Sequence, residues 1–190
     1  MSKLCFIDTE TTGLNPKSNG LIQLAGSIEI DHEVKENFNW FVKPLPSDIV
    51  EDKALEVNGI TREQMAGFPG AREIYNRFTL LLSKYVDKFE KSDKFQFIAY
   101  NARFDYDFMR AWFEKLGDKY FGSWFFFPPI DVMNLAATSL YKSRGEMKNF
   151  KLLTVAEHVG IETSEEEAHD AMYDINLTKE LYRRISCAIL

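Results

Sequence analysis

The sequence is poor in the residues that staple small proteins or bind zinc. Its 190 residues include only two cysteines, Cys5 and Cys187, and three histidines. Both cysteines lie in apolar stretches near opposite ends of the chain, which favours buried free thiols over a disulfide or a metal site. The shortage of cysteine and histidine argues against a zinc protein.

Long hydrophobic runs are also missing. No segment approaches the ~20 apolar residues of a membrane span, and the opening MSKLCFID has no apolar run of signal-peptide length. We therefore expect a cytoplasmic protein that has no membrane partner.

Positive charge is not in excess, since 23 lysines and arginines face 29 aspartates and glutamates, for a formal net charge of -6. A protein that coats nucleic acid without specificity usually carries a basic surface instead. The acidic balance still permits an enzyme that meets phosphate groups through bound divalent cations, because the cations invert the local charge.

What the sequence does contain is enough apolar material for a substantial core. Hydrophobic residues make up 45% of the chain, including 16 phenylalanines, 8 tyrosines and 3 tryptophans. The length suits one domain. There is no internal repeat, low-complexity tract or linker, so we expect a single domain over residues 1–190.

Apolar periodicity predicts a mixed sheet covered by helices, and hence an α/β fold. Strands are expected at residues 3–8, 21–30, 37–44 and 95–100, with the polar residues 31–36 as the connection between the second and third. Helices are expected at residues 71–89, 104–117, 130–141, 152–160 and 166–184. Gly117 suits a helix C-cap, and the phenylalanines at 125–127 are expected in the core or in a packed loop.

Acidic residues stand where two of the predicted strands end. Asp8 and Glu10 lie on one face of the first strand at its carboxyl end, where open α/β sheets commonly place their sites. Taken alone the pair is typical of a solvated strand end, but a bridging cation would remove its repulsion. Asp105 follows the strand at 95–100, and taken alone it suits the N-terminal end of a helix.

The last helix combines Asp174 with His169, five residues earlier. Neighbours on a helix face are three or four residues apart, so this spacing does not stack the two side chains. A metal ligand and a base would instead approach one reacting centre from different angles, about 140° apart around the helix.

These stretches resemble the three motifs of the DEDDh family of 3′–5′ exonucleases, which have the ribonuclease-H-like fold. FIDTETTGL resembles the first motif, AYNARFDYDFM the second and HDAMYD the third. The similarity spans about residues 4–181 and looks closest to the proofreading epsilon subunits of bacterial DNA polymerase III and their stand-alone relatives. Tyr100 and Asn58 stand where many members carry histidine. The sister type has tyrosine four residues before the last aspartate, where this chain has Asp170, so the histidine type fits better.

The resemblance implies a mechanism that uses two divalent ions, Mg²⁺ or Mn²⁺. Asp8 would bridge both ions, Glu10 and Asp174 would complete one site, and Asp105 would support the other. His169 would deprotonate the attacking water, work that suits an unperturbed pKa near ~6.5. The products would be nucleoside 5′-monophosphates.

The resemblance also implies a group of substrate contacts at the 3′ end of single-stranded nucleic acid, with DNA favoured over RNA. The residues expected to touch the substrate are Thr11, Gly13, Leu14, Asn101 and Phe104. Phe104 could stack on a base, although an aromatic beside a strand end is more often part of the core. The cations Lys142, Arg144, Lys148 and Lys151 could follow a phosphate backbone, and a solvated loop is the blander interpretation.

Two alternatives stay open. The chain could be an exoribonuclease resembling ribonuclease T or oligoribonuclease, because the contacts that recognise a 2′-hydroxyl cannot be placed from sequence. It could also be a binding module without turnover, although all five motif positions carry the chemically competent residue. A polymerase partner, a homodimer and independent action are equally compatible with the sequence.

Overall fold

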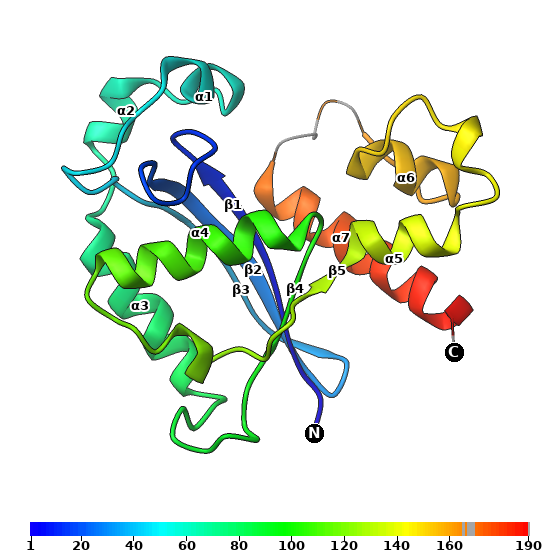
Figure 1. Ribbon diagram of the computed structural model, residues 1–190, viewed down its shortest axis with the longest axis horizontal. Helices are drawn as coiled ribbons and strands as arrows, with labels where there is room; N and C mark the ends of the chain where they lie inside the picture. The colour runs from blue at the N-terminus through cyan, green and yellow to red at the C-terminus, as the bar shows by residue number, and fades with distance from the viewer. Residues whose placement is uncertain (165, 167–169, 190) are drawn as a thin grey trace.

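The computed structural model describes residues 1–164, 166 and 170–189, and its centre is a five-stranded sheet in the order β3-β2-β1-β4-β5 (Figure 1). The strands are β1 (Lys3–Thr11), β2 (Leu21–Ile30), β3 (Glu33–Phe41), β4 (Gln96–Ala99) and β5 (Ile130–Asp131). The first three form an antiparallel meander, whereas β4 pairs with β1 and β5 pairs with β4 in parallel. The expected mixed sheet is confirmed.

Helices cover both faces of this sheet (Figure 1). They are α1 (Asp52–Val57), α2 (Arg62–Ala66), α3 (Ala71–Ser83), α4 (Ala102–Lys115), α5 (Val132–Ser139), α6 (Leu152–His158) and α7 (Ala171–Ile189). One core cluster joins Ile7 of β1 to Phe78 of α3 and Phe113 of α4. A second cluster joins Phe6 of β1 to helices α5, α6 and α7. The sheet is therefore the middle of three layers.

A buried ion cluster fixes α7 against β2. The carboxylate of Glu29 is 1% exposed and lies 3.0 Å from Lys179 Nζ and 2.7 Å from the Arg183 guanidinium. Lys179 also donates a hydrogen bond to Ser27 Oγ. Burying a carboxylate is costly unless it is paired, so these contacts favour the position at which α7 crosses the sheet.

Several expected element bounds differ from the structure. Residues 33–36 belong to β3, and the connection from β2 is only Asp31 and His32, both with positive φ, as a tight hairpin turn requires. This half of the strand was not predicted because its sequence, EVKE, is polar. The polarity fits the position of β3 at the edge of the sheet, with an exposed face. Helix α3 ends at Ser83, and residues 130–131 form β5 instead of starting a helix.

The last helix also begins later than expected, at Ala171 instead of residue 166. Gly117 follows α4 with φ of 82°, as predicted for a helix end. The prediction for the phenylalanine run was wrong in part, because Phe125 is buried whereas Phe126 and Phe127 are 38% and 78% exposed.

Cys5 is a buried free thiol, as expected, and burial raises its pKa. The side chain of Cys187 lies outside what the structure describes. Within the described ranges, every helix is too short or too polar to cross a lipid bilayer.

Candidate nuclease active site

The carboxyl end of β1 points alternate side chains at the two helical layers. Cys5 and Phe6 lie in different core clusters, Cys5 with α3 and α4 and Phe6 with α5 to α7. Because side chains alternate along a strand, Thr9 faces α4 while Asp8 and Glu10 face the layer that contains α7. The strand therefore places Asp8 and Glu10 at the end of the sheet where the two helical layers meet, a position that we call the seam.

Asp105 reaches the same strand from α4. Its side chain is 3% exposed, and its Oδ1 accepts hydrogen bonds from the Thr9 backbone N–H at 3.0 Å and from Thr9 Oγ1 at 2.8 Å. It stands in the first turn of α4, where an acid is favourable. Burial against β1 nevertheless distinguishes it from an ordinary solvated cap, and from Asp107, which is exposed and lies 3.5 Å from Arg103.

The start of α4 is held in an uncommon conformation. Asn101, directly before the helix, is left-handed with φ of 64° and ψ of 48°, a region that asparagine tolerates better than most residues. Its backbone N–H donates to Asp131 Oδ1 at the end of β5. The turn thus ties the ends of β4 and β5 to the helix that carries Asp105.

Asp174 arrives from the first turn of α7. The carboxylate of Asp170 accepts hydrogen bonds from the backbone N–H groups of Met172 and Tyr173, which is the pattern of a helix N-cap. Asp174 N–H donates to the Asp170 carbonyl. His169 lies outside the described residues, so the expected 140° between His169 and Asp174 stays a prediction.

These four carboxylates interact through their charges. Burial, and then the negative charges of Asp105, Glu10 and Asp174, raise the pKa of Asp8 well above its ordinary value. Burial and Asp174 raise the pKa of Glu10 to about 7. Burial also raises the pKa of Asp105 to about 7, against the lowering effect of the hydrogen bonds from Thr9. Clustered acids with such shifts are typical of functional sites.

The structure thus brings Asp8, Glu10, Asp105 and Asp174 together from β1, α4 and α7. In the ranges that it describes, no three His, Cys, Asp or Glu side chains already stand in an arrangement that would hold a metal ion.

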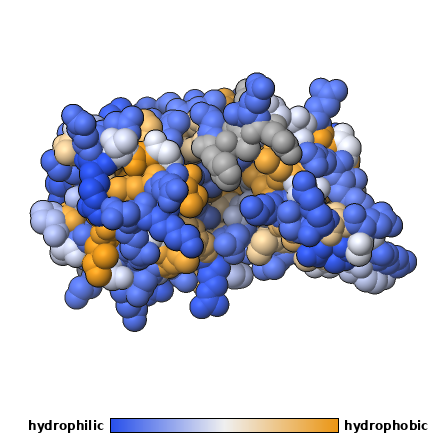
Figure 2. Space-filling view, turned by 90° about the horizontal axis from the view of Figure 1, so that it is seen from above, coloured by the Kyte–Doolittle hydropathy of each residue, from blue (hydrophilic) through white to orange (hydrophobic). Residues whose placement is uncertain are grey.

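A pocket of about 420 Å³ lies beside the cluster and contains most of the expected substrate contacts. The pocket is lined by the end of β1, the turn after it, residues 51–58 and one side chain of α4: Thr9, Glu10, Thr11, Gly13, Leu14, Glu51, Lys53, Ala54, Val57, Asn58 and Phe104. Leu14 is 82% exposed, and Phe104 is half-buried with its other side on Phe108. Asn101 does not line this pocket, and its side chain is exposed. Figure 2, which looks onto this end of the molecule, shows apolar side chains gathered on one side of a hollow.

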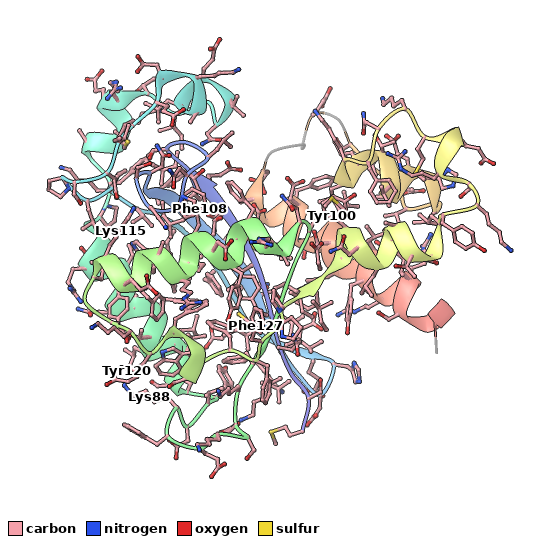
Figure 3. The ribbon with its side chains drawn as sticks, viewed as in Figure 1. Lys88, Tyr100, Phe108, Lys115, Tyr120 and Phe127 are labelled. Carbon is pink, nitrogen blue, oxygen red and sulfur yellow. The ribbon has the colours of Figure 1, made fainter. Side chains whose placement is uncertain are left out.

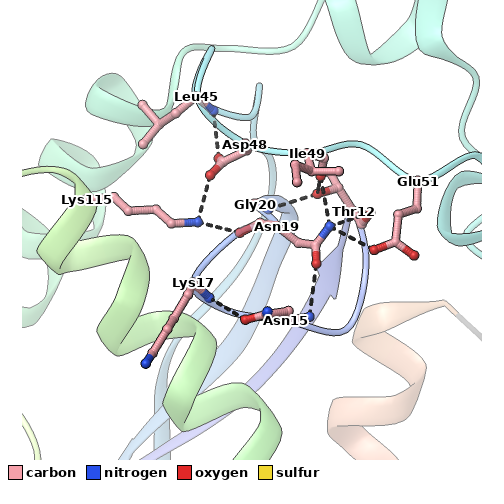
Figure 4. A network of polar contacts seen from close by, with 10 residues as sticks. All are labelled: Thr12, Asn15, Lys17, Asn19, Gly20, Leu45, Asp48, Ile49, Glu51 and Lys115. Atoms are coloured by element: carbon pink, nitrogen blue, oxygen red, sulfur yellow. Dashed lines mark hydrogen bonds and ion pairs between the residues drawn. The ribbon is translucent and has the colours of Figure 1, made fainter.

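A polar network behind the pocket was not foreseen from the sequence (Figure 4). Asn19 is 1% exposed and its Nδ2 donates to the carbonyls of Thr12 and Ile49 and to Glu51 Oε1. Lys115 donates to the Asn19 carbonyl and lies 2.7 Å from Asp48. The only signal in the sequence is the density of Asn, Gly and Pro after β1, which indicates a turn but not its partners.

The network leaves no room for a side chain at Gly13. A Cβ atom there would come within 2.3 Å of Asn19 Nδ2 and of Glu51 Oε1. Glycine therefore lets the turn after β1 approach its supports closely.

The two departures from the family pattern have structural roles. Asn58 Nδ2 donates to the Thr11 carbonyl at 3.1 Å and so fixes the pocket wall. Tyr100 Oη donates to the Phe150 carbonyl at 2.7 Å. Neither side chain hydrogen-bonds to one of the four carboxylates among the contacts of the described residues.

Known proteins are similar to this chain over nearly its whole length. The family model RNase_T, described as an exonuclease, matches residues 5–182. DNA polymerase III PolC-type of Thermotoga petrophila is 28% identical over 94% of this chain and 11% of that protein. Ribonuclease T of Baumannia cicadellinicola subsp. Homalodisca coagulata is 26% identical over 93% of this chain and 79% of that protein. The chain thus spans about a tenth of the length of its PolC-type relatives.

Solved structures agree on the fold. The zinc-bound form of the E. coli exonuclease I complex with single-stranded DNA has a TM-score of 0.78 at 22% identity, over 99% of this chain and 41% of that chain. This likeness confirms the ribonuclease-H-like fold. With the family match, it also confirms the predicted resemblance: the chain belongs to the RNase_T exonuclease family, whose members include 3′–5′ exonucleases of the DEDDh type.

Proposed function

We propose that this protein is a metal-dependent 3′–5′ exonuclease that hydrolyses single-stranded DNA from its 3′ end and releases nucleoside 5′-monophosphates. The observation that carries the proposal is the mutual charge interaction of Asp8 with Glu10, Asp105 and Asp174, acids that come from three separate elements of an exonuclease-family fold. Four acids crowded at a sheet end repel one another and so destabilise the fold, an arrangement that is typical of functional sites.

The residues present fit hard divalent cations. All four donors are carboxylates, which suit Mg²⁺ or Mn²⁺, and burial and the charges of neighbouring acids raise the pKa values of Asp8, Glu10 and Asp105. Asp8 and Glu10 from β1, Asp174 from α7 and Asp105 from α4 would hold two ions. When bound, two such ions neutralise the phosphate, lower the pKa of water and stabilise the leaving oxygen.

The chain's own groups would then position the reaction and move its proton. The oxygen of a water attacks the phosphorus, the bond from phosphorus to the 3′ oxygen breaks, and that oxygen takes a proton from solvent. His169 would accept the proton of the attacking water. This role for His169 comes from its place in the third motif.

The pocket beside the carboxylates would hold the terminal nucleotide. Leu14 and Phe104 offer apolar surfaces on which a base could rest, and Thr11 and Gly13 form the wall next to Glu10. Base contacts with an aromatic ring contribute about 1–3 kcal/mol each. Asn101, which stands outside the pocket, would contact the strand beyond the terminal nucleotide.

The test is digestion of matched single-stranded DNA and RNA oligonucleotides, labelled at either end, with Mg²⁺, Mn²⁺ or EDTA. We expect a metal-dependent ladder that starts at the 3′ end and is lost in His169→Ala and Asp8→Ala. The exposed His32, in the β2–β3 turn, gives the matched control, because His32→Ala removes a histidine far from the cluster. Absence of cleavage of both polymers with both metals would refute the proposal.

An exoribonuclease is the second candidate, and one observation favours it. The likeness to ribonuclease T covers 79% of that protein, whereas the likeness to PolC-type polymerases covers about a tenth. The relative rates on the DNA and RNA oligonucleotides decide between the two. A polymerase partner or a homodimer stays a proposal for either candidate.

A further inference from the structure

A basic segment, residues 141–151, lies between α5 and α6 and stands out in an acidic chain. It carries Lys142, Arg144, Lys148 and Lys151 against the single acid Glu146, a net charge of +3 where the whole chain has -6. All four cations are exposed. Within the part of the chain that the structure describes, none of them forms an ion pair with a carboxylate.

The basic segment is anchored at several points, which distinguishes it from a freely solvated loop. Met147 is buried, and Phe150 packs against the core cluster on the α7 side of the sheet. The Arg144 guanidinium lies 4.6 Å from the centre of the Phe150 ring, and Ser143 Oγ is 2.9 Å from His158 Nε2. The cations therefore project from defined positions. A guanidinium stacked on a ring also keeps its N–H edges free for phosphate oxygens.

One of these anchors connects the segment to the carboxylate cluster. Tyr100 Oη donates to the Phe150 carbonyl, and Tyr100 directly precedes Asn101 and the helix that carries Asp105. Figure 3 shows Tyr100 at the N-terminal end of α4, on the side of α5 and α6. A single hydrogen bond, from Tyr100 to Phe150, thus links the basic segment to the end of the sheet where the four carboxylates lie.

The opposite wall of the site has the reverse charge. Residues 51–57, which supply Glu51, Lys53 and Val57 to the pocket, contain three acids and one lysine. A polyanionic strand that enters the site is repelled by this wall and attracted by the basic segment. Such charge complementarity selects the side on which the strand runs.

We propose that the basic segment binds the phosphate backbone of the substrate strand on the 5′ side of the scissile bond. This rests on the proposed nuclease function and adds to it: the preferred substrate is an oligonucleotide of several residues, held by contacts outside the nucleotide pocket. Phosphate contacts of this kind position a strand without reading its sequence.

The test compares the triple variant Arg144→Gln/Lys148→Gln/Lys151→Gln with the triple variant Lys88→Gln/Lys91→Gln/Lys119→Gln. The second removes the same charge from exposed lysines elsewhere, and Figure 3 shows Lys88 far from Tyr100, on the side of Tyr120. Binding of a fluorescent 12-residue single-stranded DNA is followed by anisotropy in EDTA over a range of salt concentrations. Cleavage is followed with the same DNA and with the p-nitrophenyl ester of thymidine 5′-monophosphate, which has no upstream strand.

We expect the first triple variant to bind the 12-mer about tenfold more weakly at ~0.1 M salt. The slope of log affinity against log salt should fall by about 2, at ~0.7 per lost phosphate contact on a single strand. The rate with the p-nitrophenyl ester should not change. Because binding is measured without metal, the outcome stands even if the protein cleaves neither substrate, which would count against the nuclease proposal alone.

Three results would overturn the proposal. Equal weakening in both triple variants would indicate a general effect of net charge. Equal loss of the rate on the p-nitrophenyl ester would indicate a disturbed active site. A lower Tm with unchanged DNA affinity would indicate that the cations stabilise the fold and do not bind the strand.

Discussion

At the scale of single residues, Glu10 shows the conflict between stability and chemistry in this site. Its pKa is raised to about 7 by burial and by Asp174, so above pH 7 it is ionised in surroundings that disfavour its charge. In EDTA at pH 8, the free energy of unfolding of the uncharged Glu10→Gln variant should be about 1–3 kcal/mol higher than that of the parent. Urea unfolding followed by circular dichroism measures the difference.

The same substitution should lower the metal-dependent rate by about two orders of magnitude or more, because it removes a proposed metal ligand. Asp107→Asn is the matched control, since it removes an exposed acid outside the cluster and should change stability by less than about 0.5 kcal/mol. A Glu10→Gln protein that is less stable than the parent in EDTA would contradict the charge-repulsion account.

The acids of the site could be selected from the sequence because three short motifs stand in order. The hydrogen bonds and burial that surround each acid could not be predicted. The hydrogen bonds from Thr9 to Asp105 join residues 96 positions apart, and no local pattern encodes that contact. The roles of Asp8, Glu10, Asp105, Asp174 and His169 stay predictions, and His169 lies outside the described residues.

At the scale of elements, apolar runs located the buried strands well. The predicted span of β2 matches residue for residue, because apolar residues recur along its whole length and every residue in it is buried. Polar or very short elements escaped, including the first half of β3, the two residues of β5 and helices α1 and α2. Their hydrophobic signal is too short or too one-sided to read from one sequence.

The turn after β1 is the element whose stability the nucleotide pocket needs. Replacing Asn19 by alanine removes its hydrogen bonds to the carbonyls of Thr12 and Ile49 and to Asn15 N–H. Leaving such groups unpaired should cost about 1–3 kcal/mol in unfolding free energy. It should also raise KM for an oligonucleotide more than it lowers kcat, because Gly13 and Leu14 lose their support.

Thermal unfolding and steady-state kinetics measure the two effects of Asn19→Ala. Asn76→Ala is the control, since that asparagine is exposed in α3 and its side chain has no hydrogen bond in the described structure. If Asn19→Ala left both Tm and KM at the parent values, the network of Figure 4 would not be what shapes the pocket.

At the scale of the whole molecule, the sheet and the two helical layers meet at one seam, where acidic side chains from all three layers influence one another's pKa. Residues of β1, α4 and α7 contribute the cluster, while the Glu29 ion pairs hold α7 on β2. The fold class followed from the order of elements, whereas the Glu29 pairs did not, because they join residues about 150 positions apart. A single exonuclease domain over residues 1–190 stays a prediction.

This shared charge should make the stability of the metal-free protein depend on pH in an uncommon direction. Glu10 and Asp105 have ordinary pKa values near ~4 in the unfolded chain and about 7 in the folded one. Between these values the folded protein binds more protons than the unfolded protein, so the unfolding free energy falls as pH rises through that window. In EDTA we therefore expect Tm to decrease from about pH 5 to about pH 8 and to level off above it.

Divalent ions should reverse this trend, because they replace the lost protons among the same carboxylates. Millimolar Mn²⁺ or Mg²⁺ should raise Tm at pH 8 and have little effect at pH 5, where protons occupy the cluster. Thermal unfolding across this range, with EDTA or metal, tests both halves, and the double variant Glu10→Gln/Asp105→Asn should flatten the curve in EDTA. A Tm that rises with pH in EDTA, or a metal effect that persists undiminished at pH 5, would show that the acids at the seam do not control stability. The cluster is then a solvated group of surface acids, and the site proposed here loses its physical basis.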